Sequence, residues 1–190
     1  MSLQKQQDFL ARLFTDEGLR QNFLSEPDTI GAENGLSETE IVDLEAVLPE
    51  ELGFFADSLF WKRLREVEKI LPLSKKVLKE DFTKHFRQFS RAFNPQTIKK
   101  HFEDALEFSK FLQNQTLEPR WVNDLAKFEF SRLTFNSDTK KFVFVKFNHD
   151  IREIIREITH VDSDSQTNFR QKTTFALWLK VGKTRKQFVW

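Results

Sequence analysis

The sequence predicts an α+β protein in which an N-terminal all-helical unit is followed by a small antiparallel sheet with a short helix. Apolar residues recur at three- and four-residue steps through most of the first 135 residues, which is the spacing of amphipathic helices. A short run rich in Phe and Val follows, and two alternating runs joined by a Gly-Lys turn end the sequence. We therefore expect a helical domain at residues 1–116 and an α+β region with a C-terminal hairpin at residues 117–190.

The composition is that of a soluble globular protein, with 39% hydrophobic and 31% charged residues among 190. No apolar run approaches the roughly 18 residues that span a bilayer, so we expect no membrane insertion. The first residues lack the basic patch and apolar block of a secretory signal, and cysteine is absent, which together indicate a cytoplasmic protein. The absence of cysteine also excludes disulfides, thiolate metal ligands and cysteine nucleophiles.

Short helices are expected at the start of the chain. Residues 2–16 place Leu and Phe side chains close to one helical face, and residues 17–27 predict a second helix that Pro27 ends. Ser37 and Glu40 then have the spacing of a capping box, in which the two side chains satisfy free backbone N–H groups. A third helix is therefore expected to begin at this point.

Longer helices are expected next. Between residues 50 and 71 apolar side chains recur at the steps that a buried helix needs, and Pro72 ends this pattern. Residues 73–93 and 95–115 continue the same periodicity, the latter with Pro95 at a favoured first-turn position. The whole N-terminal part is therefore predicted to be helical.

Strands are expected only in the last third of the chain. Residues 118–135 predict one more helix, residues 141–147 a strand, and residues 149–160 a short amphipathic helix. Two strands at residues 173–181 and 184–190 form the terminal hairpin around the Gly-Lys turn. Together these segments predict a small antiparallel sheet that packs on helices.

Alternation predicts which side chains this sheet buries. Four apolar residues alternate along the first hairpin strand and are expected to face inward: Phe175, Leu177, Leu179 and Val181. In the preceding helix, Trp121, Leu125 and Phe128 are expected to connect the helices to the sheet within one core.

Charge is unevenly distributed although the net charge is only +1. Residues 1–57 contain three basic side chains against thirteen acidic ones, whereas residues 58–100 contain twelve basic side chains against four acidic ones. After Asp164 there are six basic side chains and no carboxylate side chain. Two interpretations stay open: acidic and basic surfaces partly face each other across the fold, or a basic surface binds an anionic partner.

The segment "FWKRL" places aromatic and basic side chains together. On a helical wheel Trp61 lies outside the apolar arc, so we expect a neighbouring helix or the second region to cover it. Arg63 falls inside the arc and must either extend its guanidinium to solvent or pair with a buried carboxylate. We predict a structural buried pair of Arg63 with Asp104, while Glu103 and Glu107 are the other candidate partners.

Motifs for catalysis are absent. The segment "VGKT" resembles part of a phosphate-binding loop, but it lacks the earlier Gly and is followed by a predicted strand. The four His residues are not spaced as metal ligands, although His149 with Asp150, or His101 with Glu103 and Asp104, are adjacent enough to exchange protons. We therefore expect no enzyme, no catalytic residue, no metal site and no cofactor.

The chain contains, in this order, "FLARLFTDEGLRQNFLSEP", "NGLSETEIVDL", "FFADSLFWKRLREVEKILP", "FEDALEFSKFL" and "WVNDLAKFEF". In these segments it resembles a family of bacterial proteins encoded beside multinuclear non-haem iron oxidative enzymes of bufferin and methanobactin type. The resemblance is to an actinobacterial and cyanobacterial branch and covers about Phe9 to Glu129. It implies a partner or peptide-recognition subunit, and the N-terminal region of this family is catalogued as a DNA-binding domain.

We therefore predict a non-catalytic protein-interaction or peptide-recognition subunit, which the resemblance makes a partner of a metal-dependent oxidative enzyme. A protein or peptide is the expected partner, bound by addition to an exposed strand edge. The alternative is a DNA-binding transcription regulator that holds phosphates with the basic helical segment at residues 82–100.

Two groups of residues are the candidates for binding. The first, which we call the basic surface, consists of Lys62, Arg65, Lys84, Arg87, Arg91, Lys99 and Lys100. The second lies on the predicted hairpin and its strand edge and consists of Trp178, Lys180, Lys183 and Arg185.

Overall fold

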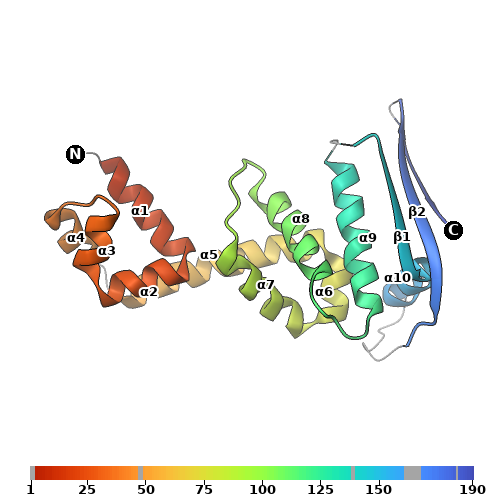
Figure 1. The fold of residues 1–190 in the computed structure, drawn as a ribbon, viewed down its shortest axis with the longest axis horizontal. Helices are drawn as coiled ribbons and strands as arrows, with labels where there is room; N and C mark the ends of the chain where they lie inside the picture. Colours follow the sequence, from red (N-terminus) through yellow and green to blue (C-terminus); the bar gives the residue numbers. More distant parts are fainter. Residues whose placement is uncertain (1–2, 47–48, 138–139, 161–167, 183) are drawn as a thin grey trace. The chain divides into compact units, whose positions relative to one another are not determined.

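The computed structural model describes residues 3–46, 49–137, 140–160, 168–182 and 184–190, and it confirms the α+β class (Figure 1). The first helices are α1 (Leu3–Thr15), α2 (Glu17–Ser25), α3 (Pro27–Glu33), α4 (Glu38–Glu45) and α5 (Pro49–Ile70). They are followed by α6 (Pro72–Leu78), α7 (Glu80–Ala92), α8 (Lys100–Gln113) and α9 (Trp121–Asn136). The last elements are β1 (Phe142–His149), α10 (Ile151–His160), β2 (Gln171–Val181) and β3 (Thr184–Val189).

The chain divides into two compact units, and the expectation of one core is therefore wrong. One unit comprises Met1–Arg65 with Ser90–Asn94, and the other comprises Glu66–Phe89 with Pro95–Trp190. The second unit mixes helices and sheet because α6 and α8 pack against α9, which in turn packs against β1. The predicted boundary between residues 116 and 117 lies between α8 and α9, before the first strand, and the division into domains at 1–116 and 117–190 stays a prediction.

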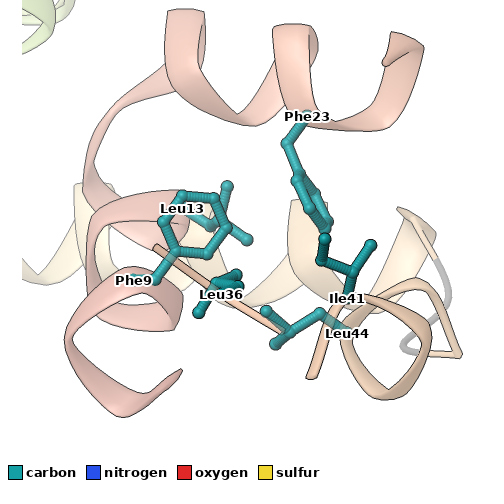
Figure 2. Close-up of a cluster of buried hydrophobic side chains, with 6 residues drawn as sticks. All are labelled: Phe9, Leu13, Phe23, Leu36, Ile41 and Leu44. Carbon is teal, nitrogen blue, oxygen red and sulfur yellow. The ribbon is translucent and has the colours of Figure 1, made fainter. Parts of the chain in front are cut away.

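The first unit contains a compact apolar cluster at its centre. Figure 2 shows the side chains that form it: Phe9, Leu13, Phe23, Leu36, Ile41 and Leu44. The phenyl rings of Phe9 and Phe23 meet edge to face with centroids 5.3 Å apart. A methyl group added at Gly31 would lie 2.5 Å from Cγ1 of Ile41, so α3 and α4 approach more closely than a larger residue permits.

Local signals explain where these helices begin. The predicted capping box at Ser37 and Glu40 is confirmed: the Glu40 carboxylate accepts from Ser37 N at 2.8 Å, and Glu40 N donates to the Ser37 hydroxyl at 3.4 Å. Pro27 does follow the end of α2, but it also starts α3, a helix that the sequence pattern did not predict. The missing N–H of proline costs nothing at a first helical position, so the same residue both stops and starts a helix.

Two helix boundaries in the second unit differ from the sequence prediction. The pattern over residues 73–93 is interrupted at Lys79, whose φ of 50° separates α6 from α7. The placement of Pro95 in a first helical turn is wrong, because α8 starts only at Lys100. The Glu103 carboxylate accepts hydrogen bonds from the backbone N–H groups of Gln96 at 3.2 Å and Thr97 at 2.8 Å, which holds this segment outside the helix.

Helix α9 is the centre of the second unit, where Figure 1 shows it beside the sheet. The predicted junction residues Trp121, Leu125 and Phe128 are all buried. The ring of Phe128 lies 5.5 Å from the ring of Trp178 and 6.3 Å from that of Phe147. These contacts confirm that this helix connects the neighbouring helices to the sheet.

The sheet is antiparallel with the strand order β1-β2-β3, and the expected orientation of β2 is wrong. Its helix-facing residues are Thr174, Ala176 and Trp178, which are buried, whereas Val181 is exposed. The other residues expected to face inward, Phe175, Leu177 and Leu179, are half-buried on the opposite face. Alternation favoured the face with Phe175, Leu177 and Leu179 because the other face of β2 also carries Lys172, Thr174 and Lys180. The indole of Trp178 nevertheless packs on α9 and places its own face against the helices.

Candidate interaction surface on the sheet

The basic surface does not lie on one compact unit. Lys62, Arg65 and Arg91 belong to the first unit, whereas Lys84, Arg87, Lys99 and Lys100 belong to the second. Two of these cations contact carboxylates: Arg91 Nε lies 2.8 Å from Glu17, and Lys84 Nζ lies 2.7 Å from Asp81. Lys62, Arg65, Lys99 and Lys100 are exposed and Arg87 is half-buried.

The environment of Arg63 differs in part from the prediction. Its guanidinium is half-buried and donates from Nη2 to the carbonyl oxygen of Phe93 at 3.0 Å. Asp104 is fully buried in α8, and its pairing with Arg63 stays a prediction. Trp61 was expected to be covered, but it is exposed, and its indole meets the ring of Phe60 edge to face with centroids 5.3 Å apart.

The hairpin candidates occupy different places in the sheet. Trp178 lies on the predicted hairpin, in the central strand β2, with its indole buried against α9. Its Nε1 donates to the side-chain oxygen of Gln187 on β3 at 3.1 Å, which satisfies the buried indole. Lys180 and Arg185 are exposed cross-strand neighbours beside the turn, where Gly182 adopts the positive φ of 60° that such turns favour. Lys183 lies outside the described residues.

The face of the sheet turned away from α9 is apolar and aromatic, and we call it the outer face. Residues that pair across antiparallel strands share a face, so the register assigns its members. The outer face consists of Phe142, Phe144, Lys146, Phe175, Leu177, Leu179, Val181, Thr184, Lys186, Phe188 and Trp190. Four of its aromatic side chains are between 48% and 61% exposed: Phe142, Phe144, Phe188 and Trp190.

The aromatic rings of the outer face contact one another. Phe144 and Phe175 stack with an interplanar angle of 10° and centroids 5.6 Å apart. The indole of Trp190 lies 6.2 Å from each of these two rings, so the three side chains form one continuous aromatic patch across the strands.

Buried polar contacts fix the sheet beneath this patch. One carboxylate oxygen of Asp124, on α9, accepts from the backbone N–H groups of Asn148 and His149 at 3.0 Å each and lies 2.7 Å from Nδ1 of His149. The Thr174 hydroxyl donates to the carbonyl of His149 at 2.8 Å. The end of β1 is thereby attached both to α9 and to β2.

The proton-transfer pair His149 and Asp150 is not formed. His149 pairs instead with Asp124, and Asp150 accepts from Lys172 Nζ at 2.7 Å. Partial burial opposes ionisation of Asp150, but hydrogen bonds from Lys172 and from the backbone of Glu153, together with the charges of Lys172 and Arg152, outweigh it, and the pKa of this carboxyl is lowered. Among the described residues no group of three His, Asp or Glu side chains has the arrangement of a metal site.

The comparisons with known proteins assign no family. No family model matches this chain, and a search of curated proteins finds no match. The resemblance to partners of iron oxidative enzymes therefore stays a prediction. In the part of the chain that the structure describes, no helix combines the length and the apolar character needed to cross a membrane.

The charged side chains in the segments that form the sheet are basic. Residues 140–149 and 168–190 contain no carboxylate side chain, while they include eight Lys and Arg besides Lys183. At the start of β1, Lys140 and Lys141 line a hollow of about 480 Å³ together with Phe142, Val143 and Phe144. The sheet therefore combines apolar contact area with a positive electrostatic potential.

The free edges of the sheet differ. In the described chain, β3 pairs only with β2, and five of its six residues are exposed. Phe175 and Trp190 exchange both backbone hydrogen bonds, so by alternation the backbone N–H and C=O of Val189 and Gln187 point away from β2. On β1 the carbonyl of Lys146 accepts a hydrogen bond from Lys127 Nζ at 2.9 Å, which occupies part of that edge. Strand β3 is thus the more accessible edge.

Proposed function

We propose that this chain is a non-catalytic interaction protein that recognises a protein or peptide through its three-stranded sheet. The observation that supports this function best is the aromatic patch formed by Phe144, Phe175 and Trp190 on an exposed sheet face. Contiguous exposed apolar side chains mark interaction sites, and aromatic residues contribute most of the binding energy at many interfaces. The resemblance noted above suggests that the partner is a metal-dependent oxidative enzyme.

The polar side chains of the sheet support a binding role in preference to a catalytic one. Asp124 and His149 are both buried, and the hydrogen bonds of the carboxylate are directed to the backbone at the end of β1. The exposed polar side chains around the aromatic patch are mainly Lys and Arg, which offer charge and hydrogen-bond donors for a partner.

A co-purification experiment tests this function. The tagged chain is recovered from native lysate as wild type and as the double variant Phe144→Thr with Trp190→Thr, which keeps β-forming residues on the strands. The matched control is Phe54→Ala, which removes an exposed aromatic ring from α5. We expect a protein partner to accompany the wild type and the control but to be lost from the double variant.

Two results would count against the proposal. The first is equal recovery of the partner with the double variant, which would place the interface elsewhere. The second is tight duplex DNA binding without a protein partner, with affinity falling by about 0.9 log unit per log unit of salt for each phosphate neutralised. That result would favour the alternative function, a DNA-binding transcription regulator that contacts phosphates through the basic surface.

A further inference from the structure

We infer that the segment recognised by the sheet is an extended peptide that adds antiparallel to β3, with apolar residues in its N-terminal half and carboxylates in its C-terminal half. This inference rests on the proposed function and specifies the chemistry of the partner. It follows from the edge of the sheet, the order of side chains along β3 and the charge of the surrounding residues.

The backbone of β3 provides the docking edge. Gln187 and Val189 direct their N–H and C=O groups away from β2, and in the described chain no strand pairs with this side of β3. An added strand satisfies these groups with backbone hydrogen bonds, while its alternate side chains lie beside those of β3 on each face. Because the sheet is antiparallel throughout, an antiparallel addition continues its pattern.

The side chains of β3 form a chemical gradient along this edge. Near the turn, Arg185 and Lys186 project to opposite faces of the sheet, and Lys180 of β2 lies directly across from Arg185. At the other end, Phe188, Val189 and Trp190 are apolar. An antiparallel strand begins beside Trp190 and ends beside the turn, so its first residues meet apolar side chains and its last residues meet cations.

The charge also distinguishes this partner from other occupants. A second copy bound by its own outer face would bring the same surface to both sides of a two-fold interface. Lys146 and Lys186 would then meet a sheet that carries no carboxylate side chain to pair with them. A single-stranded nucleic acid would match the charge and the rings, but Leu177 and Leu179 lie between β1 and β3 beside the aromatic patch, where aliphatic side chains offer its phosphates no contact. A strand with apolar and acidic halves complements both ends of β3.

The test measures the binding of defined labelled peptides to the intact chain by fluorescence anisotropy. The probe is an eight-residue peptide, capped at both ends, with Val and Leu in the first four positions and Glu and Thr in the last four. Its matched control has the same residues in reverse order. We expect the forward peptide to bind about tenfold more tightly than the reversed one, the effect of two or three cross-strand pairs.

Backbone and charge are tested separately. Methylating the peptide nitrogens that face β3 should abolish binding, whereas methylating the alternate nitrogens should leave it intact, because only the first set donates to the sheet. The double variant Arg185→Glu with Lys186→Glu should lose the preference for the Glu peptide and prefer its Lys counterpart. The control, Lys62→Glu with Arg65→Glu on α5, makes the same charge change outside the sheet and should bind as the wild type does.

The outcomes separate this inference from the proposed function. Equal affinity for the forward and reversed peptides overturns the inference, and so does binding of an oligothymidine in place of both peptides. If the peptides fail while the native protein partner still depends on Phe144 and Trp190, the inference is wrong and the proposed function stands. If the partner is also insensitive to those two residues, both are wrong.

Discussion

Replacing Asp124 by Ala should destabilise the second unit more than a substitution of similar size elsewhere. In the wild type one carboxylate oxygen accepts hydrogen bonds from the N–H groups of Asn148 and His149, and it contacts the His149 ring. Each buried donor left without a partner costs about 1–3 kcal/mol. Two such amides give an expected loss of about 2–6 kcal/mol in the free energy of unfolding.

The measurement is urea unfolding followed by tryptophan fluorescence in a Trp61→Phe background. The remaining indoles, Trp121, Trp178 and Trp190, all belong to the second unit, so the signal reports that unit. Asp124→Asn retains an acceptor oxygen and should lose about half as much stability as Asp124→Ala. A loss below about 1 kcal/mol for the alanine variant would show that water satisfies these amides and that the contact does not hold β1 in place.

Three other substitutions test the packing of both units, the second unit by the same fluorescence measurement and the first by urea unfolding with Trp61 retained as its reporter. Trp121→Ala should lower the free energy of unfolding by about 3–5 kcal/mol, because the buried indole packs against Phe169 with ring centroids 5.0 Å apart. An unchanged midpoint of urea unfolding would contradict the role of Trp121 in connecting the helices to the sheet. Gly31→Ala should destabilise the first unit through its clash with Ile41, whereas the same change at the open position Gly53 should not. Burial raises the pKa of Glu129 above 4.5, although hydrogen bonds from Leu73 and Ser74 at the start of α6 oppose this shift. As pH rises, the Glu129 carboxyl therefore loses its proton at a lower pH in the unfolded state than in the folded state. The free energy of unfolding of the wild type, relative to that of Glu129→Gln, should then fall as pH rises above 4.5 towards the pKa of the folded state. Parallel pH profiles for the two proteins would refute this.

Local features were predictable from sequence because their causes lie within a few residues. The capping box at Ser37 and the hairpin turn at Gly182 each depend on a short pattern whose partners are near in the chain. Pro27 shows the limit of such patterns, since the same residue is compatible with the end of one helix and the start of another. The structure resolves this because the apolar cluster of the first unit packs around both helices.

The candidate site was harder to predict because it depends on contacts between distant residues. Asp124 and Glu129 appear in the sequence as ordinary helix carboxylates, but their partners lie 25 and 55 residues away. The Glu129 carboxylate accepts from the backbone N–H and hydroxyl of Ser74 at the start of α6, a role that no local spacing indicates. Likewise, the outer face became apparent only when the strand register aligned Phe144 with Leu177 and Phe175 with Trp190.

The same accessible edge of β3 has a consequence for the colloidal behaviour of the protein. An unpaired strand with apolar neighbours is a template for edge-to-edge aggregation, and natural proteins oppose this with charged side chains at the edge. Here Arg185 and Lys186 occupy that position, and like charges keep two such edges apart. Because the Debye length shrinks to about 3 Å in 1 M salt, this protection depends on ionic strength. Concentrated salt should therefore lower the solubility of the isolated chain, and an edge-blocking ligand should restore it.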